Sequence, residues 1–234
     1  MMDPLTDDEL PQGDEKRAAV RTMFDTIAPR YDLINRLLTF RMDVGWRRTT
    51  QESLRLRPQS VVLDLACGTG DFMVALAGHG HRPIGIDLSY GMLAAARSRE
   101  PRVQGDLLDL PVADSSVDAA VCGFALRNLV ALEPFFAEVA RVVRPGGRIA
   151  LLDVSQPDNA VMRWGHGLYF NKVVPRVGGL LSDRGAYAYL PKSVSYLPEP
   201  ASLMSSLLSA GFVEVERHQL SGGIAQLLTG AKPA

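Results

Sequence analysis

The sequence predicts an α/β fold: a doubly wound, mostly parallel β-sheet of seven strands, preceded by a helical cap and ending in an antiparallel hairpin. From Val61 onward, short runs of β-forming apolar residues alternate with stretches of helical spacing, the pattern of βαβ units around a parallel sheet. Before Val61, apolar residues recur at helical spacing through residues 16–57. Near the C-terminus, Gly222-Gly223 separates two strand-like runs, which indicates a hairpin.

The 234-residue chain is expected to form one domain, residues 16–234, behind a mobile acidic tail of residues 1–15 that lacks apolar periodicity. Within it, we expect a helical cap (16–57, interrupted at Pro29 and ended by Pro58), a core (58–155), an aromatic-rich lid or pocket wall (156–197), and a C-terminal helix with the hairpin (198–234). The expected strands are 61–65, 83–87, 102–105, 118–124, 147–154, 212–220 and 224–229, and the expected later helices are 70–78, 92–99, 133–143 and 202–210.

Composition narrows the class of protein. Hydrophobic residues make up 47% of the chain, enough for a buried core, and two cysteines are too few for a disulfide framework, which fits a reducing compartment. A net charge of −1 gives no overall footprint for nucleic acid, and no run of 18 apolar residues could span a bilayer. The first 15 residues, with six acids and no base, do not resemble a signal peptide. Residues 16–57 hold ten Lys/Arg against four acids, which indicates either a solvated helical face or a face for an anionic surface.

A glycine-rich turn follows the first expected strand. The run VVLDLACGTGD, from Val61 to Asp71, places a buried strand before a tight turn that opens a helix. Glycine is needed where a ligand approaches the backbone closely or where φ is positive. Asp87, nineteen residues after Gly68, ends the second strand, where its carboxylate can accept both hydroxyls of a ribose. A Walker A motif is absent and Met73 occupies the third glycine position of the dinucleotide fingerprint, so a nicotinamide oxidoreductase is disfavoured.

The remaining pattern, D-x-A-x-G-x-G, resembles the cofactor motif of class I S-adenosylmethionine-dependent methyltransferases, with Ala66 in place of the first of three glycines. The resemblance implies a Rossmann-like fold and S-adenosyl-L-methionine as cofactor. It also places Asp106, after the third strand, where such enzymes contact the adenine amino group. The cofactor-binding residues that it implies are Asp64, Ala66, Gly68, Thr69, Gly70, Asp87, Asp106, Leu107 and Gly123.

Further segments resemble the quinone-biosynthesis C-methyltransferases, the demethylmenaquinone and 2-polyprenyl-benzoquinol methyltransferases, from about Lys16 to the C-terminus. The resemblance implies methylation of a ring carbon of demethylmenaquinol, the last step of menaquinone biosynthesis. A polyprenyl benzoquinol of ubiquinone biosynthesis is the close alternative, because nothing in the motifs separates one ring from two. The predominance of arginine over lysine is typical of GC-rich genomes and favours menaquinone. The segments that carry the resemblance are 24–35 with Trp46, 123–128, 141–148 running into 153–155, and 187–193.

The implied reaction needs an activated ring carbon, because carbon is a poor nucleophile. Ionising an adjacent ring hydroxyl with a phenol-like pKa of about 10 costs roughly 4 kcal/mol at pH 7. We expect Arg127 and Asn128, just beyond the fourth strand, to hold the ring oxygen or an activated water, with Arg127 stabilising the developing oxyanion. Asp153, at the end of the fifth strand, and Tyr31 or Asp32, from the cap, are second candidates for proton relay or substrate orientation.

Two positions depart from the family pattern. Asp43 replaces a frequent histidine and cannot do imidazole chemistry, so if that histidine were the base in relatives, this protein would need another. Asp153 replaces a glutamate and keeps the carboxylate with a shorter reach. The four histidines are His79, His81, His166 and His218. They are expected in surface loops, poorly placed for a metal cluster, and no metal is expected.

A polyprenyl tail must be met at a bilayer, because each buried CH₂ contributes about 0.8 kcal/mol. We therefore expect a cytoplasmic protein that binds peripherally to the inner face of the cytoplasmic membrane, through the basic helices of 16–57 and the segment 156–197. A small-molecule O- or N-methyltransferase should lack the Tyr31-Asp32 and Arg127-Asn128 segments, and a non-catalytic subunit should have a degraded glycine turn. The sequence predicts no oligomeric state.

Overall fold

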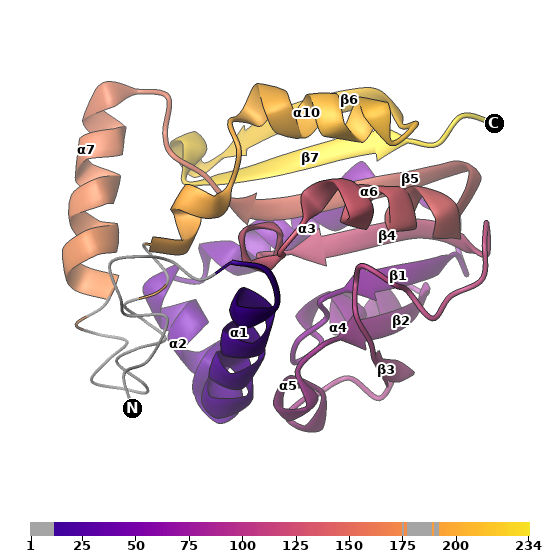
Figure 1. Ribbon diagram of the computed structural model, residues 1–234, viewed down its shortest axis with the longest axis horizontal. Coiled ribbons are helices and arrows are strands. Elements are labelled where there is room, and N and C mark those ends of the chain that lie inside the picture. Colours follow the sequence, from indigo (N-terminus) through magenta and orange to yellow (C-terminus); the bar gives the residue numbers. More distant parts are fainter. Residues whose placement is uncertain (1–11, 175, 177–188, 190–191) are drawn as a thin grey trace.

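A single seven-stranded sheet forms the centre of the protein, seen in a computed structural model that describes residues 12–174, 176, 189 and 192–234 (Figure 1). The strand order is β3-β2-β1-β4-β5-β7-β6, with β1 to β5 parallel and β7 antiparallel to both β5 and β6. The predicted doubly wound sheet with a C-terminal hairpin is therefore confirmed. The strands are β1 (Val61–Leu65), β2 (Arg82–Asp87), β3 (Arg102–Gln104), β4 (Val117–Gly123), β5 (Val143–Val154), β6 (Val213–Leu220) and β7 (Ala225–Ala231).

Helices pack on both faces of the sheet, because side chains alternate between the two faces of each strand. Leu63 and Leu65 of β1 join one core with α6 (Leu132–Val142) and α10 (Pro200–Ser209). Val62, on the opposite face of the strand just before Leu63, joins a second core with α3 (Met42–Ser53) and α4 (Asp71–Gly78). The strands between these two layers are almost fully buried, as expected for a parallel sheet covered on both sides.

The predicted N-terminal cap has a small core of its own. It consists of α1 (Gly13–Ile27), a 3₁₀ turn at Ala28–Arg30 where Pro29 interrupts the helix, and α2 (Tyr31–Leu38), after which α3 returns to the sheet. Apolar side chains of α1 and α2 pack together with Met92 of α5 (Tyr90–Ala94). Figure 1 shows α7 (Ala160–Leu168) standing beyond the carboxyl ends of the parallel strands, with α2 below it. Short turns complete the described chain: η2 (Leu126–Asn128), η3 (Tyr169–Val173), η4 (Val194–Tyr196) and η5 (Ser221–Gly223).

Several boundaries differ from the sequence predictions, and β5 begins at Val143 instead of residue 147. Helix α1 begins at Gly13 rather than Lys16, so part of the expected tail is helical; residues 1–11 lie outside the described residues. Helix α5 ends at Ala94 instead of continuing to residue 99, because the Arg97 backbone N–H donates to the Thr69 carbonyl and draws the chain toward the glycine turn. Of the expected lid, residues 175, 177–188, 190 and 191 lie outside the described residues; the part before them forms α7 and η3.

Candidate active site

The glycine turn leaves β1 with three residues in the left-handed region. Ala66, Gly68 and Gly70 have φ values of 55°, 54° and 87°. A Cβ at Gly70 would lie 3.0 Å from the Ser98 Cβ, whereas a Cβ at Gly68 would project into open space. Gly68 therefore leaves its backbone open to a ligand, while Gly70 permits the close approach of the Ser98 segment.

The Met73 side chain packs against Gly85 of the neighbouring strand β2. A Cβ at Gly85 of β2 would lie 2.6 Å from the Met73 Sδ and 2.7 Å from the Cys67 Sγ. Because Gly85 has no side chain, Met73 lets helix α4 pack closely against β2. In a dinucleotide-binding fold, the third glycine of the fingerprint provides this close packing of helix and strand.

Asp87 holds the turn in place from the end of β2. One of its carboxylate oxygens accepts from the Gly68 backbone N–H at 2.8 Å, and the other accepts from the Ser89 backbone N–H at 2.8 Å. Burial raises the pKa of Asp87, and these two backbone donors oppose the increase. Asp64 is buried in β1, where burial raises its pKa well above the usual range and leaves its Oδ2 without a hydrogen-bond partner among the described residues.

A cavity opens between this turn and α1, and we call it the glycine-turn cavity. Six of the nine predicted cofactor-binding residues line it: Ala66, Gly68, Asp87, Asp106, Leu107 and Gly123. The other three, Asp64, Thr69 and Gly70, are absent from its lining. Thr69 instead donates to the Asp32 carboxylate at 2.5 Å, which joins the turn to the cap. The predicted Asp32 relay is thus already engaged, since its other oxygen lies 3.0 Å from an Arg97 nitrogen.

Arg127 and Asp153 form a buried ion pair at the ends of β4 and β5. Arg127 is 5% exposed and Asp153 is 0% exposed. The guanidinium contacts Asp153 and donates to the Phe124 carbonyl at 2.9 Å, and its Nε donates to the Ser193 hydroxyl at 3.2 Å. Asp153 also accepts from the Arg127 and Val154 backbone N–H groups. Asp153 therefore orients Arg127, and its oxygens are occupied by these contacts.

Arg127 reaches a second cavity, of about 390 Å³, which we call the cap cavity. Its walls come from the cap, from α3 and from α7 and η3, and most of them are apolar. Phe24, Tyr31 and Phe124 line both this cavity and the glycine-turn cavity, so the two compartments adjoin there. The predicted site residues are thus divided: Tyr31 faces both compartments, Arg127 faces the cap cavity and Asn128 faces the glycine-turn cavity.

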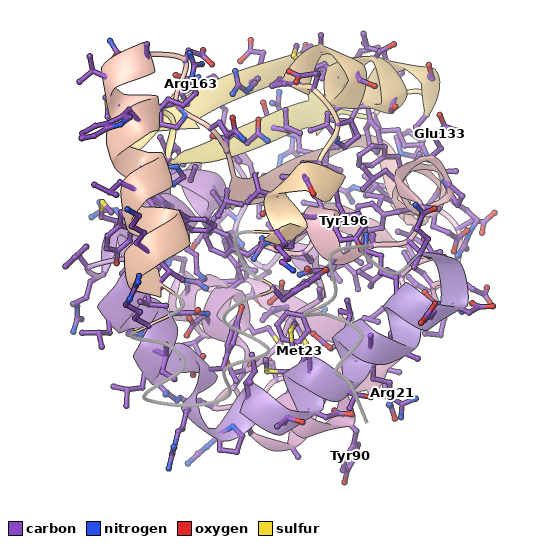
Figure 2. The ribbon with its side chains drawn as sticks, turned by 60° about the vertical axis from the view of Figure 1, so that its left-hand side comes forward. Arg21, Met23, Tyr90, Glu133, Arg163 and Tyr196 are labelled. Atoms are coloured by element: carbon purple, nitrogen blue, oxygen red, sulfur yellow. The ribbon has the colours of Figure 1, made fainter. Side chains whose placement is uncertain are left out.

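A buried lysine of the cap, Lys16, contacts the segment that contains Arg127 and Asn128. Lys16, at 4% exposure, donates from Nζ to the Arg127 carbonyl at 3.1 Å and to the Leu129 carbonyl at 2.7 Å. Its Nζ also lies 3.5 Å from the centre of the Tyr196 ring, and burial lowers the Lys16 pKa to about 8. Figure 2 shows Met23 pointing inward from the same helix, below Tyr196, whereas Arg21 points outward.

Two neighbouring side chains hold Asp43 in the wall of the cap cavity. It is 1% exposed, and it accepts from the Thr39 hydroxyl at 2.7 Å and from Arg47 at 2.5 Å. Within the residues that the structure describes, no group of three His, Cys, Asp or Glu side chains could hold a metal ion.

Comparison with known proteins identifies the family. A sequence model of the ubiE/COQ5 methyltransferase family matches residues 12–232. The chain belongs to the ubiE/COQ5 methyltransferase family. It is 39% identical to the ubiquinone/menaquinone biosynthesis C-methyltransferase UbiE of Syntrophotalea carbinolica, over 91% of this chain and 93% of that protein. It is 40% identical to the demethylmenaquinone methyltransferase of Mycolicibacterium vanbaalenii, over 91% and 94%.

Solved structures confirm the predicted class I methyltransferase fold. An S-adenosylmethionine-dependent methyltransferase of Thermotoga maritima superposes with a TM-score of 0.65 at 20% identity, covering 91% of this chain and 99% of that one. A methyltransferase of Haloferax volcanii, solved with the activator Trm112, gives a TM-score of 0.67 at 19% identity, with 90% and 98% coverage. The family and the fold confirm the expectation of a methyltransferase.

Three residues of this ubiE/COQ5 family member were missed or misplaced by sequence reasoning. Lys16 carries no local signal, because its partners lie 111 and 113 residues away. The predicted loop position of His166 is wrong: it lies on α7, lines the cap cavity and stacks on Phe170. A signal existed, since Met162, His166 and Tyr169 are spaced by four and three residues and so share one helical face. The placement of His218 was also wrong, because it lies on strand β6.

Proposed function

We propose that this protein methylates a ring carbon of demethylmenaquinol, at the junction of its two cavities. S-adenosyl-L-methionine is the methyl donor, and the reaction is a quinone C-methylation, in keeping with the names of its relatives. The observation that carries the proposal is the cap cavity: a compartment of about 390 Å³, mostly apolar, which adjoins the glycine-turn cavity and has two arginines, Arg47 and Arg127, in its wall. A bicyclic ring with an apolar tail matches that lining.

The glycine-turn cavity fits the donor. Gly68 offers open backbone, Asp87 offers a carboxylate for ribose hydroxyls, and Leu107 with Ala125 offers apolar walls for an adenine ring. Asp106 accepts from the Leu108 backbone N–H at 3.0 Å and lies 3.3 Å from Arg17, so α1 covers this end of the compartment. When bound, S-adenosyl-L-methionine supplies an electrophilic methyl group next to the shared wall.

Arg127 acts on the acceptor side in this proposal. The ring oxygen becomes negative as the ring carbon becomes a nucleophile, and a fixed guanidinium stabilises that charge without reorganising. Asp153 fixes the guanidinium, and Asn128 and Tyr31 orient the ring at the junction. Aligning the two reactants can contribute about 7–11 kcal/mol, more than the roughly 4 kcal/mol needed to ionise the hydroxyl.

A turnover assay tests the proposal. Purified protein would be given radiolabelled S-adenosyl-L-methionine with reduced demethylmenaquinone, or with a reduced demethylated polyprenyl benzoquinone, and the products identified by mass spectrometry. Methylation of the naphthoquinol alone supports the proposal. Methylation of both rings indicates a protein that serves both pathways, and methylation of the benzoquinol alone, or of neither, contradicts the naphthoquinol assignment.

The same proposal places the protein on the inner face of the cytoplasmic membrane, where its acceptor resides. In the described part of the chain, no helix is long and apolar enough to cross a membrane. Two exposed apolar stripes instead flank the cap cavity. Leu33, Leu37 and Phe40, spaced by four and three residues, are 68%, 49% and 71% exposed, and a second stripe on α7 includes Trp164 at 73%. The Phe40 ring lies 5.8 Å from that of Tyr169, which follows α7, so the stripes meet.

Most of the exposed charges beside these stripes are positive, and Asp158, ahead of α7, is an exposed acid among them. Arg30 and Arg41 flank α2, and Arg163 lies on α7, near its start in Figure 2. Asp32 of α2 and Asp43 in the first turn of α3 are buried. Apolar stripes rimmed by basic residues match the surface of an anionic bilayer. This narrows the expected contact surface from all of 16–57 and 156–197 to α2, its C-terminal turn and α7.

We predict that Trp164 reports membrane binding. Vesicles of phosphatidylglycerol and phosphatidylcholine should shift tryptophan emission to shorter wavelength, because Trp164 enters lipid while Trp46, the other tryptophan, stays buried at 6% exposure. Trp164→Phe should abolish the shift, and Leu33→Ser with Phe40→Ser should prevent co-flotation. Val213→Ser, exposed on β6, is the matched control. Wild-type protein that fails to float with these vesicles would contradict the prediction.

A further inference from the structure

One wall of the cap cavity carries a buried polar atom that has no hydrogen-bond partner among the described residues. Among the described residues, four buried side-chain nitrogen or oxygen atoms lack a hydrogen-bond partner, and the His166 Nε2 is the only one of them that belongs to a residue lining the cap cavity. A buried polar group without a partner costs about 1–3 kcal/mol, so such an atom beside a cavity indicates a ligand that completes it.

We propose that His166 is the base of the acceptor site, and that its Nε2 accepts the proton of a ring hydroxyl of the quinol. This rests on the proposed function, because it concerns the same acceptor in the same cavity. The proposal also accounts for the departure from the family pattern at position 43. Asp43 stands where relatives often carry a histidine, and His166 supplies an imidazole in the same cavity, which Asp43 also lines.

The surroundings of His166 favour a neutral, fixed imidazole. Burial lowers the pKa of His166, so the ring is uncharged at pH 7 and one nitrogen is free to accept. The imidazole stacks on the Phe170 ring, with centroids 5.1 Å apart and planes inclined by 24°, which fixes its plane. It therefore faces the cavity with a preset orientation.

The other ionisable groups on the described walls are unsuited to accept a proton. Arg47 and Arg127 are permanent cations. Asp43 is already engaged by Thr39 and Arg47. Burial raises the pKa of Tyr31 and of Tyr169, which keeps both phenols protonated, and the Tyr169 hydroxyl donates to the Leu38 carbonyl at 2.7 Å. His166 is the remaining acceptor among these groups.

The proton transfer balances within the known reaction. The hydroxyl O–H bond breaks, its proton moves to Nε2, and the oxygen lone pair increases the electron density of the adjacent ring carbon. That carbon bonds to the methyl group while the methyl–sulfur bond breaks, its electron pair remaining on sulfur. The ring C–H proton then leaves to solvent, the imidazolium returns its proton to the ring oxygen, and the quinol is aromatic again.

The test compares two histidines. With S-adenosyl-L-methionine and a short-chain demethylmenaquinol, His166→Gln should lower kcat by about 10²–10⁴-fold. Wild-type kcat should fall on acidification at a pH below the usual imidazole pKa of about 6.5, because burial lowers the pKa of His166, and this acid limb should disappear in the variant. His218→Gln, a half-exposed position 3.2 Å from Glu216, should retain both kcat and the acid limb. A His166→Gln variant with wild-type kcat, or one that keeps the acid limb, would overturn the proposal.

A binding measurement separates this inference from the proposed function and from a failure to fold. In NMR spectra of imidazole-labelled wild-type protein saturated with S-adenosylhomocysteine, adding 1,4-naphthalenediol should shift the ring nitrogen signal of His166 and leave that of His218 unchanged. If the turnover assay fails but this shift occurs, the acceptor assignment is wrong and His166 still binds a ring hydroxyl. If the diol binds and the His166 signal does not move, the inference is wrong whatever the turnover.

Discussion

Arg127→Ala is expected to abolish most turnover and to destabilise the fold. Removing a fixed cation from a developing oxyanion costs about 10²–10³ in kcat. The same change leaves Asp153, at 0% exposure, without its partner, and breaking a buried ion pair costs about 3–5 kcal/mol of unfolding free energy. Urea unfolding and turnover, measured after confirming that the variant still binds S-adenosyl-L-methionine, would check the two effects. Unchanged turnover would contradict the proposed role.

A double variant separates the two effects. Arg127→Met with Asp153→Asn removes both charges together and keeps an acceptor for one of the two backbone N–H groups that contact position 153. It should recover much of the lost unfolding free energy, because no buried charge is left unpaired. Turnover should stay low. A double variant that regains both would mean that Arg127 serves folding alone. Arg144→Ala, which breaks the more exposed pair with Asp118, is the control for loss of an arginine.

Asp87→Asn is expected to weaken binding of the cofactor by about 10- to 150-fold, as measured by calorimetry with S-adenosylhomocysteine. The carboxylate accepts from the Gly68 and Ser89 backbone N–H groups, and hydrogen bonds to a charged group contribute about 1.5–3 kcal/mol. The asparagine amide would point its NH₂ group toward one of these two backbone N–H groups. The glycine turn would then lose its shape, and the site would lose the negative charge of Asp87.

Acidification should imitate this substitution. Burial raises the pKa of Asp87, so the wild-type carboxylate takes up its proton at a higher pH than an exposed aspartate would, and donor binding should weaken as pH falls through that range. Asp87→Asn should lack this dependence. The control is Asp158→Asn, whose side chain is 74% exposed ahead of α7, and its affinity should equal that of the wild type. An unchanged affinity in folded Asp87→Asn would contradict the role.

The sheet and the glycine turn could be predicted because their signals are local. The bounds of β1 match the prediction, since its apolar run ends at a turn that requires positive φ. The antiparallel pairing of β6 and β7 follows from the Gly222-Gly223 pair between two short strand-like runs. These features depend on residues that are neighbours in sequence, so a single chain is enough to read them.

The site was predictable only in part, because its contacts join distant segments. The motif placed Arg127 beside the acceptor, but the clamp by Asp153 joins the ends of two strands, and the Lys16 contact spans more than a hundred residues. His166 was assigned to a loop because turn residues and aromatics conceal the short helix α7. Which predicted residues touch ligands remains a prediction that the variants above would check.

The wall shared by Phe24, Tyr31 and Phe124 also has a consequence for inhibition. Because both compartments open onto the same three side chains, one molecule can occupy both: an adenosyl group in the glycine-turn cavity, joined through its sulfur position by a one-carbon link to a naphthol in the cap cavity. Joining the two halves makes the second contact intramolecular, with an effective concentration in the millimolar range for short links. Such a bisubstrate compound would be selective for proteins that pair this turn with an apolar compartment.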